Sequence, residues 1–251
     1  MVWVHNLNPI LLDLGPVQIR WYGLMWVLGF LFTYWYVRQR IKQGKAPLNL
    51  EELDSMMVWG TLGVLIGARL GEILIYRFPY YLASPLKVFA VWEGGLSFHG
   101  ALVGILVAAW FWCRKYKKDL LQIADTFVIP LALANTFGRL GNFINGELPG
   151  RLTTLPWGMQ FPGVEGFRHP SQLYEAAYNV VLFAILHFNR DKKWKPGSFF
   201  ALWLMLYAVA RFITEFFREP EIYVGLLTMG QFLNVFVFAA GLGLWLYVRR
   251  K

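Results

Sequence analysis

The sequence predicts an all-α integral membrane protein of about seven transmembrane helices, the length of each set by the thickness of the bilayer. Hydrophobic residues make up 57% of the chain, and the mean hydropathy is +0.44. Only 16% of residues are charged, against about 25% in a typical soluble domain. The charges gather in short clusters, separated by largely apolar stretches of roughly 20 residues, which is the length that crosses a hydrocarbon core.

The apolar stretches are expected to be helical because isolated strands cannot satisfy their backbone groups in lipid. No polar linker divides the chain, so we expect a single membrane-embedded domain over residues 1–251. The longest segment between spans, 139–170, is expected to form a small cap, or head, over the helices. The fourth span is the least regular, because Asp125, Pro130 and Asn135 interrupt it. The predicted spans lie near residues 21–37, 56–76, 96–113, 120–138, 171–188, 198–217 and 227–248.

Lysine and arginine are distributed unequally between the two sets of loops, which predicts the orientation of the chain. One set holds fifteen of them and the other holds seven. The richer set is expected to be cytoplasmic, so the N-terminus faces outside and the C-terminus faces the cytoplasm. The poorer, outer set is rich in Gly, Pro, Asn, Trp and His, the composition of functional turns. The cytoplasmic clusters are Arg38, Arg40, Lys42 and Lys45; Arg114, Lys115, Lys117 and Lys118; Arg190, Lys192, Lys193 and Lys195; and Arg249, Arg250 and Lys251.

Several function classes are disfavoured. The net charge of +9 is explained by the basic loops, so we expect no nucleic-acid partner. The four histidines are scattered and no metal-binding, Walker or Gly-x-Ser-x-Gly motif is present, so we expect no metal and no cofactor. Cys113 is the only cysteine and faces the cytoplasmic side in this topology. Thiol chemistry on the outer side would therefore need a cysteine from the substrate. The N-terminus lacks signal-peptide features, so the first span is expected to insert by itself.

Two spans carry an arginine and a glutamate on one helix face, and charged groups at membrane depth usually face the protein interior. Arg211 and Glu215 lie four residues apart in the sixth span. They are either a neutralising pair that fixes packing, or an arginine oriented by Glu215 to bind a phosphate. Arg69 and Glu72 are interpreted as structural. They lie beside a face of small residues that lets another helix approach closely, formed by Gly63, Gly67 and Gly71.

The stretch Gly138–Glu147 is the densest candidate site. Its glycines would let the backbone approach a ligand, and Arg139 can bind a phosphate or carboxylate with two parallel hydrogen bonds. Asn142 and Glu147 add polar groups there, although a simple glycine-rich helix exit is the plain alternative. His99, at the outer edge of the third span, is either a hydrogen-bonded structural residue or a proton acceptor. Tyr22 fits the aromatic belt at a membrane interface.

At these positions the chain strongly resembles the bacterial prolipoprotein diacylglyceryl transferases, over nearly its whole length. The matching segments are Arg20–Gly23, Gly94–Gly100, the signature Gly138–Glu147 continuing to Gly150 and Arg151, Arg168–Glu175, and finally Tyr207, Arg211, Glu215 and Arg218. Two departures are visible. Ala101 stands where the family often has a second glycine, and the segment from Arg151 to Arg168 is short for a substantial head.

The resemblance implies a seven-helix body in the bacterial inner membrane, with a small periplasmic head and the active site toward the periplasm. It implies transfer of the sn-1,2-diacylglyceryl group from phosphatidylglycerol to the lipobox cysteine of a prolipoprotein signal peptide, leaving a thioether and glycerol 1-phosphate. Arg139 and Arg211 correspond to the family's essential arginines. The other residues to which the resemblance assigns importance are Tyr22, His99, Asn142, Glu147, Gly150 and Glu215, and Tyr207 also lies at a matching position.

The residues suggest how such a reaction would proceed. Arg139 and Arg211 would hold the phosphate, with His99 as catalytic base and Glu215 as an orienting carboxylate. Asn142, Glu147, Gly150, Tyr22 and Tyr207 would complete the substrate site. The base remains open, because a phosphate oxygen or an arginine-stabilised network could instead let the thiol lose its proton. A lipid or anion transporter, and a non-catalytic receptor for lipoprotein signal peptides, are the alternatives from other classes.

Overall fold

The computed structural model describes residues 3–15, 18–90, 94–220 and 222–250. Trp92 and Glu93, within an outer segment, and Lys251, in the last basic cluster, lie outside these residues. The chain divides into two compact units, one made of residues 1–37 and 124–251 and the other of residues 38–123. Each of the seven expected segments contains a helix within the described part of the chain, which confirms a mostly helical protein.

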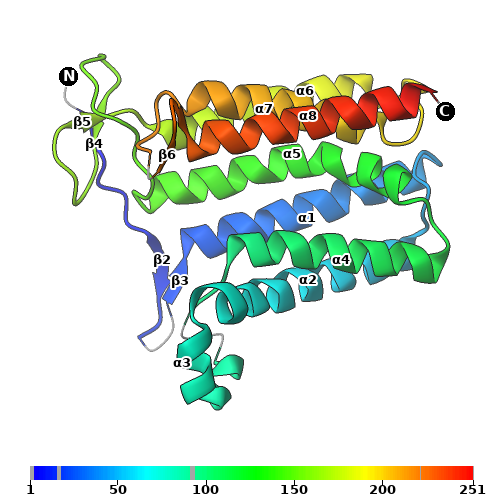
Figure 1. Ribbon diagram of the computed structural model, residues 1–251, viewed down its shortest axis with the longest axis horizontal. Coiled ribbons are helices and arrows are strands. Elements are labelled where there is room, and N and C mark those ends of the chain that lie inside the picture. The colour runs from blue at the N-terminus through cyan, green and yellow to red at the C-terminus, as the bar shows by residue number, and fades with distance from the viewer. Residues whose placement is uncertain (1–2, 16–17, 91–93, 221, 251) are drawn as a thin grey trace. The chain divides into compact units, whose positions relative to one another are not determined.

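The first unit contains α1 (Trp21–Lys42) up to Val37, α5 (Leu120–Ile144) from Ala124, and then α6 (Ser171–Asn189), α7 (Ser198–Thr214) and α8 (Met229–Arg250). Figure 1 shows α6, α7 and α8 running side by side, with α5 next to them. Their apolar core lies between α1, α5, α6 and α7. It consists of Tyr36, Val128, Ile129, Ala132, Leu182, Leu186 and Phe199.

Asp125 explains one of the polar interruptions in the fourth span. Its carboxylate oxygens accept hydrogen bonds from the backbone N–H groups of Gly197 and Phe200, each at 2.8 Å. These N–H groups belong to the start of α7, where the first turn of a helix has no backbone acceptors of its own. Asp125 therefore caps α7 from a neighbouring helix. Pro130 is accommodated inside α5, which continues through it.

Short strands, which the sequence had not indicated, lie at one end of the helices of the first unit (Figure 1). A three-stranded sheet has the order β1-β4-β5, with β1 parallel to β4 and β4 antiparallel to β5. Two antiparallel hairpins, β2-β3 and β6-β7, precede α1 and α8. The strands are β1 (Trp3–Val4), β2 (Ile10–Asp13), β3 (Gln18–Arg20), β4 (Met159–Gln160), β5 (Phe167–Arg168), β6 (Tyr223–Val224) and β7 (Leu227–Thr228).

The second unit is built on two antiparallel helices, α2 (Leu50–Gly71) and α4 (Phe98–Tyr116). A capping box between Asn49 and Glu52 begins α2, and the Ser97 hydroxyl accepts a hydrogen bond from Gly100 N at the start of α4. The helix α2 continues into a π-helical turn, η1 (Glu72–Tyr76), followed by α3 (Phe78–Ala83) and a 3₁₀ turn, η2 (Pro85–Phe89).

Backbone-to-backbone contact joins α2 to α4, as the glycine pattern predicted. A Cβ on Gly67 would lie 2.4 Å from the carbonyl oxygen of Gly100, and one on Gly104 would lie 2.0 Å from that of Gly63. A Cβ on Gly71 would lie 2.7 Å from the Cα of Gly100. Small residues are what allow helices to approach this closely in a membrane.

Arg69 is architectural, as expected, but it does not pair with Glu72. Its guanidinium donates hydrogen bonds to backbone carbonyl groups of η2 and of the segment between η2 and α4, while Glu72 forms its ion pair with Arg77 at 3.2 Å. The planar guanidinium, with its five donors, therefore holds a loop in place. The accepting carbonyls are those of Lys87, Val88, Ala90, Gly94 and Gly95.

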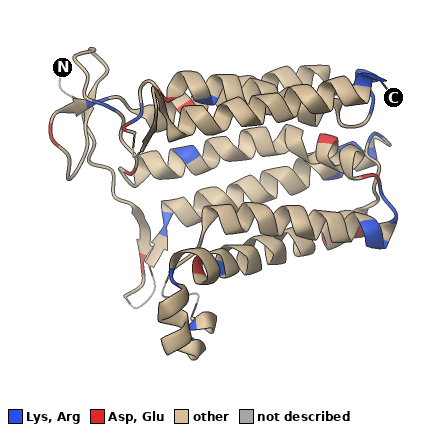
Figure 2. Cartoon of the chain, in the orientation of Figure 1, with Lys and Arg blue, Asp and Glu red and all other residues tan. Residues whose placement is uncertain are grey.

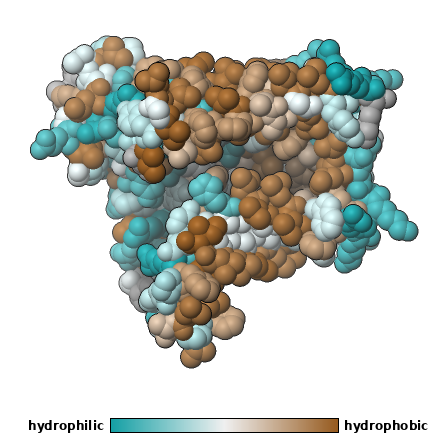
Figure 3. Space-filling model, in the orientation of Figure 1, coloured by the Kyte–Doolittle hydropathy of each residue, from teal (hydrophilic) through white to brown (hydrophobic). Residues whose placement is uncertain are grey.

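The outward faces of the helices are apolar, as a lipid environment requires. Figure 3 shows mainly hydrophobic residues on the visible surfaces of α7 and α8, and Figure 2 shows the charges of α8 gathered at its C-terminal end. On α2, Leu62 and Ile66 are 50% and 57% exposed. Soluble monomers rarely expose contiguous apolar surfaces of this kind. Within the described residues, three helical stretches are long and apolar enough to cross a membrane: 50–76, 120–144 and 229–250.

The glycine contact yields a prediction about stability. Replacing Gly67 with alanine places a methyl group against the backbone of α4, and overpacking of this kind costs about 1–3 kcal/mol. We expect Gly67→Ala to lower the midpoint of thermal unfolding in detergent. Gly60→Ala is the matched control, because it lies on the same helix with nothing within 4 Å of its Cβ position. Equal midpoints for the two variants would show that the close contact contributes nothing.

Candidate functional site

The candidate site lies in the first unit, where α5, α6 and α7 bring their charged residues together. The helix α5 runs to Ile144, six residues beyond the expected end of the fourth span. Most of the Gly138–Glu147 motif is therefore helical, although the fourth span was expected to end near residue 138. The helix presents Arg139 and Asn142 on one face, three residues apart. Gly141 lets α1 approach, since its Cβ would lie 2.9 Å from the Tyr22 ring.

Glu175, in the first turns of α6, is the centre of the site. Its side chain is fully buried, and its two oxygens contact two arginines. The Nη1 of Arg218 donates to Oε1 at 2.6 Å. The Nε of Arg139 lies 2.8 Å from Oε2, in an ion pair that lacks the alignment of a hydrogen bond. A buried carboxylate needs such partners, because an unpaired charge in a low-dielectric interior is costly.

A second carboxylate, Glu215, holds the other end of the site. Arg211 donates from Nη1 to Oε2 of Glu215, in the i, i+4 pair that the sequence indicated. The Nε of Arg218 lies 3.6 Å from the same oxygen. The Thr228 hydroxyl donates to Oε1 at 3.0 Å. Gly230 leaves room for this carboxylate, because a Cβ there would lie 2.5 Å from Oε1.

Arg218 thus connects Glu175 to Glu215, and the resulting chain of ion pairs joins α5, α6 and α7. Three arginines share two carboxylates, which leaves one positive charge in excess. Among the described residues, the Nη2 groups of Arg139 and Arg211 have no hydrogen-bond partner. The side chains of these arginines are 29% and 14% exposed. Each is held by a carboxylate on one edge and keeps donors for an anion on the other.

Glu147 is positioned separately, by two amides. Asn142 and Asn145 each donate from Nδ2 to one of its carboxylate oxygens at 3.0 Å, and Nη1 of Arg139 lies 3.4 Å from Oδ1 of Asn142. Gln172 donates to the backbone carbonyl of Glu147. Asn142 therefore links Arg139 to Glu147.

Gly150 allows its backbone segment to pack closely against the segments of Phe217 and His169. Its Cβ would lie 2.2 Å from the carbonyl oxygen of Phe217 and 2.8 Å from that of His169. Its N–H donates to the His169 carbonyl at 2.8 Å, and Arg151 N–H donates to Phe217 at 2.9 Å. This glycine lets the segment carrying Arg218 lie against the loop before α6. Burial lowers the pKa of His169, so its imidazole is neutral near pH 7 and accepts or donates one hydrogen bond with the Tyr174 hydroxyl.

The two tyrosines of the predicted site are also in the first unit. Tyr207 lies one turn before Arg211 on α7, and its ring contacts Tyr178 and Trp203. Tyr22 lies in the first turn of α1 and packs on Trp26 and on Gly141 of α5.

His99 is the one predicted site residue that belongs to the second unit. It lies in the first turn of α4, where its Nδ1 is 3.2 Å from the Tyr76 hydroxyl. The remaining predicted residues are all in the first unit. Arg139, Asn142 and Glu147 contact one another in one group, and Arg211 and Glu215 form a second.

Two important residues were not singled out as site residues from the sequence. Glu175 was named only as the end of the matching segment Arg168–Glu175, and Arg218 only as a matching position, although both carry the network. A signal for Glu175 existed, since it is an acidic residue inside an apolar span and such residues mark functional sites. Arg218 offered no such signal, because it follows the end of α7 and reads as an ordinary loop arginine.

Comparison with known proteins shows the family of this chain. A sequence model of the family described as prolipoprotein diacylglyceryl transferase matches residues 9–247. A phosphatidylglycerol–prolipoprotein diacylglyceryl transferase of Nitratidesulfovibrio vulgaris is 44% identical over 259 residues, covering 100% of this chain and 97% of the relative. The same enzyme of Legionella pneumophila subsp. pneumophila is 45% identical, covering 98% of each chain, and that of Bordetella parapertussis is 43% identical, covering 100% and 98%. The chain therefore belongs to the prolipoprotein diacylglyceryl transferase family.

Proposed function

We propose that this protein transfers the sn-1,2-diacylglyceryl group of phosphatidylglycerol to the thiol of the lipobox cysteine in a prolipoprotein, the first step of lipoprotein maturation. Its relatives are named for this activity. The observation that carries the proposal is the pair Arg139 and Arg211. Each is anchored by a buried carboxylate and has donors left for an anion. A phosphate ester that becomes a leaving group needs positioned positive charge of this kind.

The reaction breaks the bond between the diacylglyceryl carbon and the phosphate oxygen, and forms a carbon–sulfur bond to the cysteine. The electron pair of the broken bond stays with glycerol 1-phosphate. Arg139 and Arg211 stabilise the charge that develops on this phosphate, and a guanidinium can do so with paired hydrogen bonds. The network needs little rearrangement, because Glu175 and Glu215 already hold the arginines.

The neighbouring polar groups suit the glycerol headgroup. Glu147 and Asn142 offer oxygen acceptors and an amide beside Arg139. Glu215 orients Arg211, and Tyr207 lies next to it on α7. Tyr22 contributes an aromatic surface beside α5, and Gly150 keeps the supporting backbone in place.

The cysteine must lose its proton, because the thiolate is the nucleophile. An imidazole commonly acts as a general base near pH 7, and His99 is the histidine among the predicted site residues. Its hydrogen bond with Tyr76 orients the imidazole ring. The alternative is that a phosphate oxygen, its charge stabilised by the arginines, takes the proton. We propose His99 as the base.

We also propose an arrangement of the chain in the membrane. Seven helices cross a bacterial inner membrane, with the N-terminus outside and the C-terminus in the cytoplasm, as the basic clusters indicate. The whole chain acts as one membrane-embedded domain, and residues 139–170 contribute a small periplasmic head that includes β4 and β5. The site opens toward the periplasm, where a secreted signal peptide presents its lipobox cysteine.

A mass measurement tests this function. Purified protein is incubated with phosphatidylglycerol and a lipobox peptide. We expect the peptide to gain the mass of one diacylglyceryl group and glycerol 1-phosphate to appear in equal amount. A peptide whose cysteine is replaced by serine should gain nothing. Binding of the peptide without any mass gain would favour a non-catalytic receptor, and would contradict the proposal.

The arginines give a second prediction. Arg139→Ala and Arg211→Ala should each remove about 2–4 kcal/mol of transition-state stabilisation, which lowers the transfer rate roughly 30- to 1,000-fold. Arg211→Lys should also be poor, because an ammonium group keeps the charge but not the paired hydrogen bonds. Initial rates on the lipobox peptide, with protein amount and thermal midpoint checked, measure both effects.

Arg38→Ala is the control for these variants, since Arg38 is an exposed arginine on α1. It should retain the activity of the unchanged protein. Full activity in Arg211→Lys would refute the paired hydrogen bonds, and full activity in Arg139→Ala would refute the phosphate site itself.

His99→Gln tests the base. If His99 accepts the thiol proton, the variant should lose most activity near pH 7 and recover part of it at higher pH, where the free thiol ionises. Tyr76→Phe, which removes only the orienting hydrogen bond, should lose less. The rate is measured from pH 6 to 9 on the lipobox peptide. A normal rate for His99→Gln throughout this range would leave the phosphate oxygen as the proton acceptor.

A further inference from the structure

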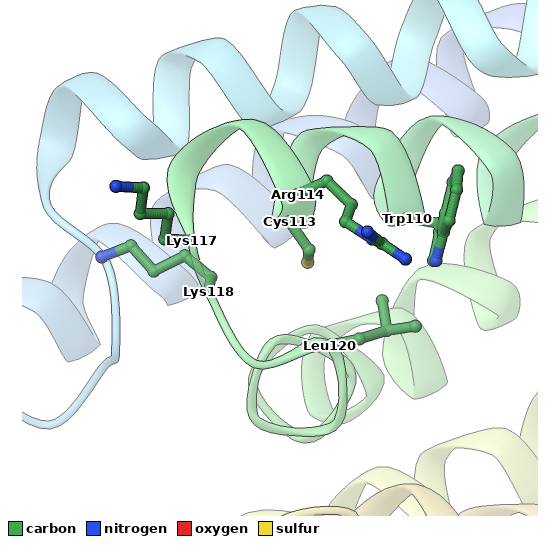
Figure 4. A pocket seen from close by; sticks show the side chains of 6 residues that line it. All are labelled: Trp110, Cys113, Arg114, Lys117, Lys118 and Leu120. Atoms are coloured by element: carbon green, nitrogen blue, oxygen red, sulfur yellow. The ribbon is translucent and has the colours of Figure 1, made fainter.

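A pocket that takes no part in the site above lies at the C-terminal end of α4 (Figure 4). Its volume is about 430 Å³, within the roughly 300–1,000 Å³ range of small-ligand sites. Figure 4 shows the Arg114 guanidinium beside the Trp110 indole, and Leu120 lying across the open space from them. The lining residues are Trp110, Cys113, Arg114, Lys117, Lys118 and Leu120.

Two basic side chains of the pocket, those of Arg114 and Lys117, are available to bind an anion. The guanidinium carbon of Arg114 lies 4.8 Å from the centre of the Trp110 ring. Within the described residues, no acceptor contacts Arg114 or the Lys117 ammonium group. Lys118 is already used, since its Nζ lies 2.8 Å from Glu52 and 3.0 Å from the Pro47 carbonyl. The nearby carboxylate of Asp119 accepts a hydrogen bond from Gln122 N, in the first turn of α5.

The rest of the pocket is apolar and continues along the helix. Cys113 and Leu120 line its wall. Beyond Trp110, the outward face of α4 carries Val107, Leu106 and Val103, which are 48%, 57% and 60% exposed. These residues follow the spacing of one helix face. A cationic head with an apolar stripe leading away from it matches a lipid with an anionic headgroup and an acyl chain.

We propose that this pocket binds one anionic phospholipid of the cytoplasmic leaflet. Its phosphate accepts hydrogen bonds from Arg114, its headgroup lies by the Trp110 ring and Lys117, and an acyl chain follows the apolar stripe of α4. Basic pockets at the cytoplasmic ends of membrane helices attract anionic headgroups, because that leaflet carries negative charge. Tryptophan at this depth is typical of a membrane interface. The inference rests on the membrane topology proposed above and on no residue of the transfer site.

The only cysteine of the chain provides a local readout, because Cys113 lines the pocket. The protein is placed in nanodiscs of phosphatidylcholine with increasing phosphatidylserine, and the rate at which a small thiosulfonate labels Cys113 is measured. We expect phosphatidylserine to slow the labelling. Arg114→Gln should raise the phosphatidylserine content needed for half-maximal protection about fivefold, the effect of one basic residue at an anionic surface.

Arg249→Gln is the matched control. Arg249 lies over Trp245 at 4.7 Å, which reproduces the arginine–tryptophan stack without contributing to the pocket. It should keep the protection of the unchanged protein, and Arg114→Lys should keep part of it. An equal loss in Arg114→Gln and Arg249→Gln would mean general surface attraction and would overturn the proposal. Protection by inorganic phosphate alone would also overturn it, since that outcome describes an anion site without an acyl chain.

Native mass spectrometry of the same variants gives an independent measurement if Cys113 labels too slowly. Arg114→Gln should retain one fewer phosphatidylserine per protein than Arg249→Gln, and equal retention would contradict the proposal. The peptide transfer assay is run in parallel. Because Arg114 is outside the transfer site, normal transfer with lost lipid retention supports the pocket, whereas failure of transfer in the unchanged protein concerns only the proposed function.

Discussion

The arrangement of the first unit depends on the buried carboxylate of Glu175, which needs positively charged partners. Its carboxylate is fully buried between α5, α6 and the segment after α7, where an unpaired charge would be unfavourable. Arg139 and Arg218 supply the compensating charge, and each comes from a different part of the chain. The close approach of Gly150 to Phe217 keeps the backbone of the Arg218 segment beside the loop before α6. Removing one partner of such a buried pair typically costs about 3–5 kcal/mol, because the other charge is left without compensation.

Different interactions stabilise the interior of each unit. In the second unit, α2 and α4 touch through glycines, so that dispersion between backbones replaces the hydrophobic effect that lipid cannot supply. In the first unit, an aromatic and aliphatic core is combined with ion pairs and with Asp125, which caps α7 across helices. A polar group buried among apolar helices needs a partner at hydrogen-bonding distance. Displacing one of these helices would separate such partners, so the helices are difficult to displace.

The chemistry follows from how the arginines are held. A guanidinium has five donors, so a carboxylate on one edge orients Arg139 or Arg211 without consuming its capacity to bind an anion. The excess of positive charge is located where α5, α6 and α7 meet. Elsewhere, the acidic residues that would suggest a polar path for transport have structural partners. Asp125 caps α7, and Glu72 pairs with Arg77. Structural contacts thus account for both carboxylates.

The helical body, the close glycine face of α2 and the Arg211–Glu215 pair could be predicted from the sequence, because hydrophobic length and helical spacing act locally. The family followed from short motifs in the same way. The continuation of α5 to Ile144, the pairing of β1 with β4, and Glu175 as the partner of both Arg139 and Arg218 depended on the tertiary structure. Arg69 shows the difference most clearly. Its spacing predicted a pair with Glu72, but its donors reach η2 and the segment before α4 instead. Spacing along a helix determines which side chains share a face, whereas burial and competing acceptors decide which partner a charged group takes.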